Sequence, residues 1–346
     1  MGNYLQTEFN KFHEAIKLHD KDDNQDLRDK RDMLEDELKT YFKKKAEKEG
    51  KARITFVLEN QGSYSMGTGN KSIDVGDYDI DVMILFNIDA NDYTPVEVKK
   101  WVFEALSRSN RTVEYMKPCV RVQYFKDGEE LYHVDLALYA NANEDEKTYI
   151  SKGKPTSASE DKFWELSQPK ELKKKINGKY NDEHDSKQFK RSIRYLKRWK
   201  DLKFRNTKSG KPTGIALTAL AYNLFNPQID RNPFDSSISP NDLESLKKLV
   251  SSIIGEFSIW NNKISVKLPV EPYNDLFEKM TNVQQETFKD KLDILEQALV
   301  DATNEPDPHE ASKILQKVFG DDFPEVDKEK SGQKRALAFP GKSESA

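Results

Sequence analysis

Two aspartates at the entry to an apolar run constrain the fold of this chain more than any other feature. The run DYDIDVMILF, residues 77–86, is predicted to be a β-strand. Side chains alternate between the two faces of a strand, so Asp79 and Asp81 share one face while Ile80 and Val82 occupy the other. The sequence therefore predicts two carboxylates side by side on one face of a sheet.

Three further strands are expected near this one. They are RITFVLEN (53–60), PCVRVQYF (118–125) and LYHVDLALYA (131–140). The first strand runs into Gly62-Ser63, and the other two are joined by Lys126-Asp127-Gly128, a sequence typical of hairpin turns. Asp135 is an isolated acid in the last strand, whose other residues suit burial. A third carboxylate is thus predicted on a neighbouring strand.

Helices are predicted before, between and after these strands in the sequence. An N-terminal helical region covers about 4–48, and the capping box Thr94-Pro95-Val96-Glu97 precedes a helix of about 15 residues. From about residue 151 the pattern is helical throughout. Apolar stripes place these helices around 189–199, 215–224, 243–253, 273–302 and 309–319. Residues 327–346 are too polar and glycine-rich to pack, so we expect a flexible tail there.

Length and composition exclude several classes of protein. At 346 residues the chain can form two lobes of roughly 150 residues each. It contains no apolar span of about 20 residues and no secretory leader, so we expect a cytosolic protein without a membrane partner. Its single cysteine, Cys119, cannot form an internal disulfide or a cysteine cluster for zinc, and is expected to be a small core residue.

Positive charge is concentrated in one part of the chain. Residues 169–211 hold 16 Lys and Arg against 5 Asp and Glu, a net +11, whereas the whole chain carries −4. One interpretation is an anionic partner near this segment. The other is that most of these side chains line the solvated faces of helices.

The three strand acids indicate metal chemistry. A dense cluster of carboxylates is costly unless positive charge neutralises it, and two Mg²⁺ ions would do so while clamping an in-line phosphoryl displacement. If Gly62-Ser63 opens a short helix, its backbone N–H groups and the Ser63 hydroxyl form a cradle for triphosphate. The alternatives are surface acids and an ordinary turn glycine followed by a serine N-cap.

The order QGSY, DYDID, HVDLALY resembles the DNA-polymerase-beta-type nucleotidyltransferase superfamily. Within it the chain resembles the cGAS-like bacterial synthases, the CD-NTases of anti-phage (CBASS) signalling. The segments PCVRV, FWELSQPKEL, RYLKRWKDLKF and KPTGIALTALAY look like the bacterial cyclic GMP-AMP synthase branch. The resemblance covers roughly residues 55–225.

This resemblance implies an α+β fold and its domain boundaries. A polymerase-beta-like nucleotidyltransferase palm with a mixed β-sheet is expected over 1–150, including the N-terminal helical region, and a helical lobe over 151–326. The flexible tail follows at 327–346. The active site is expected in the cleft between the lobes.

The resemblance also implies roles for individual residues. Gln61, Gly62 and Ser63, with Tyr64, would hold the donor triphosphate. Asp79, Asp81 and Asp135 would be the catalytic metal ligands, and Asp135 would help to deprotonate the attacking ribose hydroxyl. The remaining nucleotide contacts would come from Arg121, Lys197 and Thr213. At Thr213 relatives commonly have serine, and Lys197 has basic neighbours that could take its role.

The implied activity is synthesis of a cyclic dinucleotide, or by the same chemistry a trinucleotide, from ATP, GTP or both, with two Mg²⁺ ions that Mn²⁺ could replace. A linear oligonucleotide synthase, a nucleotidyltransferase acting on RNA or protein, and a non-catalytic nucleotide-binding module remain alternatives. In some relatives a ubiquitin-like system conjugates the C-terminus to targets; here the alternative is a passive tail. An obligate double-stranded DNA activator is not expected, because one cysteine cannot build the zinc-binding insertion of the DNA-sensing members.

Overall fold

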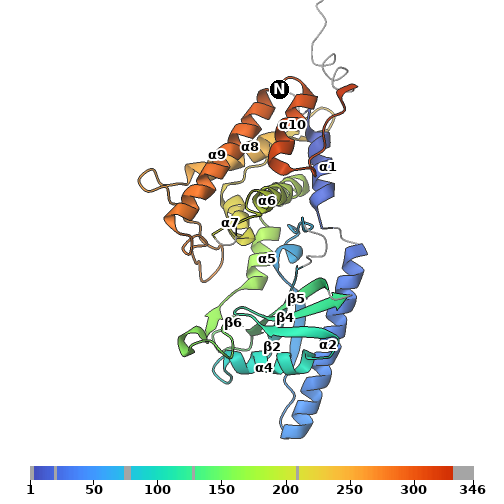
Figure 1. The fold of residues 1–346 in the computed structure, drawn as a ribbon, viewed down its shortest axis with the longest axis vertical. Helices are drawn as coiled ribbons and strands as arrows, with labels where there is room; N and C mark the ends of the chain where they lie inside the picture. The colour runs from blue at the N-terminus through green and yellow to red at the C-terminus, as the bar shows by residue number, and fades with distance from the viewer. Residues whose placement is uncertain (1–3, 19–21, 74–78, 127–128, 208–209, 330–346) are drawn as a thin grey trace, which may run out of the picture. The chain divides into compact units, whose positions relative to one another are not determined.

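The chain folds into two compact units (Figure 1). The computed structural model describes residues 4–18, 22–73, 79–126, 129–207 and 210–329. The sheet unit comprises Leu18–Ile176 with Val270–Pro272. The helical unit comprises Met1–Lys17, Asn177–Pro269 and Tyr273–Ala346.

The sheet unit is built on a mixed seven-stranded sheet. Five strands follow the order β1-β2-β5-β4-β3, β6 pairs with the end of β5, and β7 pairs with β6. The strands are β1 (Phe56–Asn60), β2 (Asp79–Phe86), β3 (Arg111–Tyr115), β4 (Val120–Lys126), β5 (Glu129–Ala140), β6 (Tyr149–Ser151) and β7 (Trp164–Leu166). Only β2 and β5 run parallel; the other pairs are antiparallel. The four predicted strands are confirmed, whereas β3, β6 and β7 were not predicted. The central residues of the hairpin turn, 127–128, lie outside the described residues.

One face of this sheet carries the main core. There, side chains of β2 and β5 pack together with those of α2 (Asp22–Glu49) and α4 (Pro95–Leu106); the strand residues in this core are Val82, Ile84, Phe86, Val134, Leu136, Leu138 and Ala140. The Thr94 side chain caps α4 by accepting from the Glu97 N–H at 3.2 Å, as the capping box predicts. Met83 and Leu85 of β2 and Ala137 and Tyr139 of β5, all odd-numbered, face the other way and form a smaller cluster with Ile150 of β6. Asp81 and Asp135 also have odd numbers, so the alternation of side chains places them on the face opposite the main core.

The helical unit contains the C-terminal helices and also the first helix of the chain. Its helices are α1 (Gln6–Ile16), α6 (Glu183–Lys203), α7 (Gly214–Leu224), α8 (Asp242–Gly255), α9 (Asn282–Asn304) and α10 (Pro308–Phe319), with the hairpin of β8 (Ile229–Arg231) and β9 (Ile238–Pro240). The helix α5 (Pro169–Asn177) leads into this unit. The N-terminal segment up to Lys17 was expected in the domain at 1–150 but belongs to the helical unit. The reason is that Phe9 and Phe12 pack against aromatic rings of that unit, those of Tyr195, Phe319 and Phe323.

Two helix boundaries also differ from the sequence prediction. The helix expected over 273–302 begins at Asn282, because Thr281 and Gln284 form a capping box at that point. The helix after Thr94 has 12 residues and ends at Leu106, before the turn into β3. The predicted tail falls largely outside the described residues, which end at 329.

Candidate active site

Two of the three strand acids lie directly side by side. Asp81 of β2 and Asp135 of β5 are register partners in the parallel pair, and Asp79 is the register partner of His133. Neighbouring strands lie about 4.8 Å apart, so the Asp81 and Asp135 side chains leave the same face at adjacent positions. The Asp79 backbone belongs to β2, but its side chain lies outside the described part of the structure.

The Gly-Ser turn lies directly against Asp81, one of this pair of acids. Gln61 donates its backbone N–H to the Asp81 carbonyl at 3.0 Å, and α3 (Gly62–Ser65) follows immediately. Gly62 has φ +66°, and a Cβ atom there would come within 2.2 Å of Asp81 Oδ2. Only glycine fits at this position, both for its backbone conformation and for the closeness of the carboxylate. The expected short helix after Gln61 is present, and its first turn lies beside Asp81.

Arg121 forms a bidentate ion pair with Asp135. Its Nε donates to Asp135 Oδ1 and its terminal nitrogen Nη2 to Oδ2, both at 2.7 Å. The two residues are register partners in the antiparallel pair of β4 and β5. Such a bidentate pair fixes the plane of the carboxylate. Arg121 is therefore a direct partner of a predicted site residue.

Cys119 is buried, as expected, but it belongs to this site rather than to the main core. Its thiol forms a hydrogen bond with Asp135, and burial together with the Asp135 charge raises the pKa of the thiol far above its usual value. The thiol therefore stays protonated and neutral. It supplies a second neighbour that holds Asp135 in place.

Several residues on the site face were missed from the sequence. His133 is buried on the same face of β5 as Asp135, and Tyr139 lies farther along that face with its hydroxyl 3.0 Å from Gln61 Oε1. Their odd numbers could have indicated this face, since period-two alternation groups them with Asp135. Nothing in the sequence alone indicates that Tyr139 reaches Gln61.

The two predicted site residues of the helical unit lie close to each other. Lys197 of α6 is buried, and a Cβ atom on Gly214 would lie 3.9 Å from its Nζ. Thr213 is the N-cap of α7, and its side chain accepts from the Ala216 N–H at 3.2 Å. Lys197 thus lies at the N-terminal end of α7, where both the ammonium group and the helix dipole favour an anion. The Thr213 hydroxyl has a structural task as a cap.

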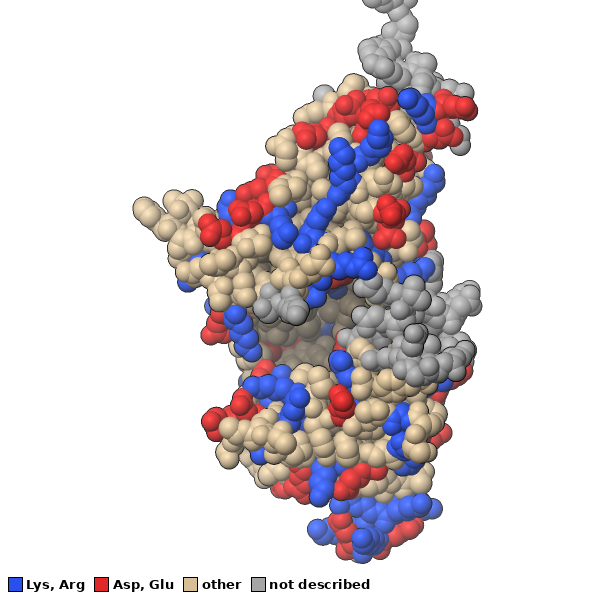
Figure 2. Space-filling model, viewed as in Figure 1, with Lys and Arg blue, Asp and Glu red and all other residues tan. Residues whose placement is uncertain are grey.

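The positive charge of residues 169–211 is partly neutralised by ion pairs within each unit. Its ion pairs include Lys187–Glu183, Arg191–Asp242, Arg198–Asp322 and Lys200–Asp201 in the helical unit, and Lys170–Glu59 in the sheet unit. On the face drawn in Figure 2, basic and acidic side chains are interspersed over each unit. This pattern supports solvated and paired helix faces for most of these lysines and arginines.

The donor set of the site suits a hard divalent cation. Mg²⁺ is usually bound through one or two carboxylates, with substrate phosphates and water completing its octahedron. Asp81 and Asp135 are two such carboxylates at adjacent register positions. Within the described residues no group of three or more potential ligands is present, and the third predicted ligand, Asp79, has no described side chain.

The mixed sheet, the Gly-Ser turn and the paired aspartates are the features on which the resemblance to nucleotidyltransferases rests. Residues 54–139 match the model of the cyclic GMP-AMP synthase DncV-like nucleotidyltransferase domain. Over these residues the chain is similar to cGAS/DncV-like nucleotidyltransferases, as the sequence motifs predict, and its fold is α+β.

Individual relatives agree with this family. A cyclic GMP-AMP synthase of Escherichia albertii is 27% identical over 169 residues, which cover 46% of this chain and 35% of that protein. The matched region thus spans about a third of the curated relative. Vibrio cholerae DncV cyclic AMP-GMP synthase has a similar fold, with TM-score 0.70 and 17% identity over 93% of this chain and 96% of the other. Escherichia coli DncV, solved with 3'-deoxy GTP, gives TM-score 0.66 and 16% identity over 89% and 93% of the two chains.

None of the helices in the described residues has the length and apolar character needed to cross a membrane.

Proposed function

We propose that this chain is a cyclic oligonucleotide synthase that joins ATP and GTP, or two copies of one of them, into a cyclic dinucleotide. The observation that carries the proposal is the close approach of the Gly62 turn to Asp81, which in turn lies in register with Asp135. A triphosphate-binding turn and a pair of metal-binding carboxylates thereby share one face of the sheet. A trinucleotide would require the same chemistry three times.

Asp81 and Asp135, with Asp79, would hold two divalent cations, Mg²⁺ or Mn²⁺. When bound, such ions neutralise charge on the phosphates and lower the barrier to displacement at phosphorus. The bidentate hydrogen bonds from Arg121 keep the Asp135 carboxylate in a fixed plane. Asp135 is thereby positioned to accept the proton of an attacking ribose hydroxyl.

The turn would bind the donor nucleotide. The first-turn N–H groups of α3 and the Ser63 hydroxyl would donate to the β- and γ-phosphates, and the absence of a Cβ on Gly62 lets the phosphates approach the backbone. In the helical unit, Lys197 at the start of α7 would add positive charge to a phosphate. Tyr64 and Thr213 are proposed as secondary nucleotide contacts.

The reaction balances without a further reagent. The ribose hydroxyl oxygen of one nucleotide forms a bond to the α-phosphorus of the other, the bond from that phosphorus to the bridging oxygen breaks, and pyrophosphate leaves. A second displacement in the opposite sense closes the ring and releases a second pyrophosphate. The supporting relatives include a Vibrio cholerae DncV complex with the linear intermediate 5' pppA(3',5')pG.

A role in anti-phage signalling is proposed from the family resemblance, as is conjugation of the C-terminus. Removing the last few residues, in cells that carry any neighbouring conjugation enzymes, tests the second point. Unchanged synthesis in those cells would mean that the tail is passive.

Incubation with radiolabelled ATP, GTP, CTP and UTP and Mg²⁺ or Mn²⁺, followed by phosphatase and chromatography, tests the activity. We expect a phosphatase-resistant product from the wild type and none from a variant carrying Asp79→Asn and Asp81→Asn. A product that loses its terminal phosphates to phosphatase and keeps only its internal phosphodiester would indicate a linear synthase. Nucleotide binding without any product would indicate a binding module.

A further inference from the structure

Tyr139 forms a buried polar contact that the proposed mechanism does not yet use. The residue lies on the site face of β5 and is 3% exposed. Its hydroxyl donates to Gln61 Oε1 at 3.0 Å and also forms a hydrogen bond with the Ser167 side chain. Because a phenol has one proton and gives it to Gln61, the Ser167 hydroxyl is the donor in the second bond. The three side chains therefore form a directed chain from Ser167 through Tyr139 to Gln61.

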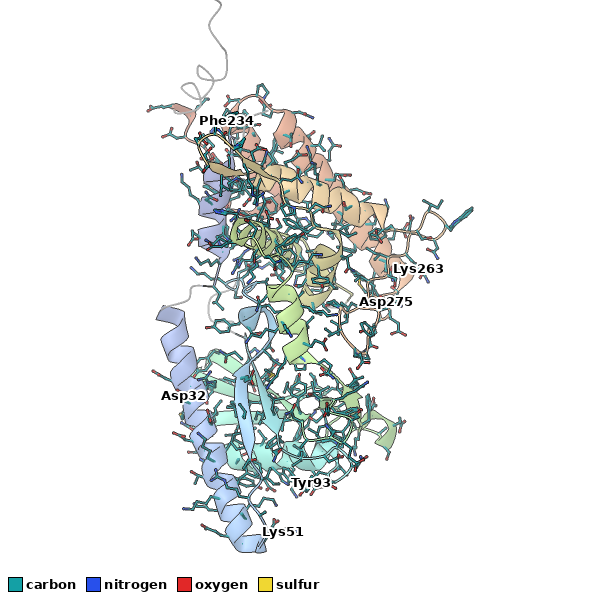
Figure 3. All side chains as sticks on the ribbon, turned by 180° about the vertical axis from the view of Figure 1, so that it is seen from behind. Asp32, Lys51, Tyr93, Phe234, Lys263 and Asp275 are labelled. Atoms are coloured by element: carbon teal, nitrogen blue, oxygen red, sulfur yellow. The ribbon has the colours of Figure 1, made fainter. Side chains whose placement is uncertain are left out.

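The Ser167 end of this chain is anchored to the sheet unit. Ser167 follows β7 and donates its backbone N–H to the Thr148 carbonyl at 2.9 Å. Three residues earlier, the Trp164 indole N–H donates to the carbonyl of Tyr93 at 2.8 Å. Tyr93, labelled in Figure 3, packs against the main core. The segment Trp164–Ser167 is thus held at both ends, and it forms the WELS part of FWELSQPKEL, to which the proposed function gives no role.

The Gln61 end of the chain lies at the phosphate-binding turn. Gln61 is the N-cap residue of α3, but its side chain does not cap that helix. Its carbonyl oxygen is instead occupied by the Tyr139 hydroxyl. The amide NH₂ group, with two donors, is consequently the end of the side chain left for other partners. Asp81 lies next to this residue, since the Gln61 N–H donates to the Asp81 carbonyl.

We propose that Tyr139, held by Ser167, is a positioning residue that fixes the Gln61 amide so that its NH₂ group is presented to a phosphate of the bound nucleoside triphosphate. The inference rests on the proposed function. A reversed amide would direct its carbonyl oxygen toward the phosphate, where two acceptors repel each other. Tyr139 opposes that reversal because its hydroxyl donates to the carbonyl oxygen, and a reversed amide would lose this hydrogen bond.

The protonation of Tyr139 supports this role. Burial, with the negative charge of Asp81 nearby, raises the pKa of the phenol well above its ordinary value of 10.0. The hydroxyl therefore keeps its proton throughout the physiological range and remains a donor. Its orienting effect is constant with pH across that range.

Calorimetric binding of non-hydrolysable GTP and ATP analogues in the presence of Mg²⁺ tests the proposal. We expect Tyr139→Phe to weaken binding about three- to tenfold, the loss of one hydrogen bond. We expect Gln61→Ala to weaken it at least as much, and Tyr139→Phe to have no further effect in the Gln61→Ala background. The matched control is Tyr41→Phe, which removes a tyrosyl hydrogen bond to Glu104 at the side of the sheet that carries the main core. It should leave affinity unchanged.

The outcomes separate this inference from the proposed function. If the wild type binds neither analogue, the proposed function fails, and the inference fails with it. If the wild type binds but Tyr139→Phe binds equally well, the inference alone is overturned. An equal loss of affinity from Tyr139→Phe in both backgrounds, together with a lower melting temperature, would show a merely structural tyrosine and would also overturn it.

Discussion

Each unit of this molecule contains one aspartate held by a two-pronged arginine, and the two pairs differ in what surrounds them. In the sheet unit Arg121 contacts both oxygens of Asp135 at 2.7 Å. In the helical unit Arg191 contacts the two oxygens of Asp242 at 2.6 and 2.7 Å. The arginine geometry is the same, so the pair by itself does not identify a functional acid.

The neighbours of the two acids distinguish them. Asp242 has a fully buried side chain, and Tyr195 and Gln188 also donate to it, at 2.9 and 3.1 Å. The Asp135 side chain is 15% exposed, and its register partner is a second carboxylate, Asp81. A buried charge surrounded by fixed donors specifies a fold, whereas a partly open acid beside another acid retains the capacity to bind a cation. The comparison therefore predicts that removing Asp135 lowers activity with little change in stability, whereas removing Asp242 lowers stability.

The largest effect is expected on turnover from Asp135→Asn. The change removes the proposed metal ligand and proton acceptor, and each of these contributions is worth about a hundredfold or more. Turnover should fall at least about a thousandfold. The unfolding free energy should change by less than about 1 kcal/mol, since Arg121 is 25% exposed and can be solvated. Initial rates and urea unfolding measure the two quantities.

Triphosphate binding is the control for that variant. Asp135→Asn should still bind triphosphate through the α3 turn and the remaining acids. A variant with near-normal turnover, or one that binds nothing because the sheet unit has unfolded, would make Asp135 a structural acid like Asp242.

The next effect is expected on stability from Asp242→Ala. Its removal leaves the largely buried charge of Arg191 without its carboxylate, while the Tyr195 hydroxyl and the Gln188 amide keep only the Phe9 and Gln228 carbonyls as acceptors. Breaking a buried pair in this way costs about 3–5 kcal/mol of unfolding free energy. Urea unfolding should show this loss. A loss below about 1 kcal/mol would remove the distinction between the two pairs.

A smaller effect is expected from Ser63→Ala at the open side of the site. The hydroxyl is proposed to donate to a phosphate, and a hydrogen bond to a charged group is worth about 1.5–3 kcal/mol. Catalytic efficiency should fall about ten- to a hundredfold with little change in stability. Ser65→Ala is the matched control, because its hydroxyl donates within α3 to the Gly62 carbonyl at 3.1 Å and not to substrate. Equal losses from both variants would assign the effect to the helix.

The sequence predicted the faces of the strands but not their neighbours. Alternation alone predicts that Asp79 and Asp81 share one face of their strand, because alternation depends only on local geometry. The parallel pairing of β2 with β5 joins segments that are far apart in the chain, and no local pattern fixes their register. The contact of Tyr139 with Gln61 depends on that register and could not be predicted.

The unit to which the first helix belongs also could not be predicted from the sequence. Phe9 and Phe12 give α1 an apolar stripe, but a stripe does not say which unit buries it. Strands β6 and β7 have three residues each, too few for a periodic pattern. Ser167 follows these strands, and the sequence around it therefore does not predict a role for its side chain.

The smallest effect is expected from protonation of His13, near the structural pair. Burial, with Arg194 second in importance and Arg191 also contributing, lowers the pKa of His13 from 6.5 to about 4. Lys17 acts in the same direction, and Glu14 opposes it. Between these two pKa values the unfolded chain binds a proton at His13 that the folded chain does not. The unfolding free energy must therefore decrease as pH falls through this window.

Urea unfolding at pH 7 and pH 5.5 measures this contribution against a His13→Gln variant, whose side chain does not titrate. Over that range we expect the wild type to lose about 1 kcal/mol more than the variant, because at most 1.36 kcal/mol is lost per pH unit for one proton. The excess should vanish above pH 7, where both states are neutral at this residue. Identical pH dependence in the two proteins would mean that His13 accepts its proton without unfolding, and that the surroundings of the Asp242 pair are more open to solvent than its contacts indicate.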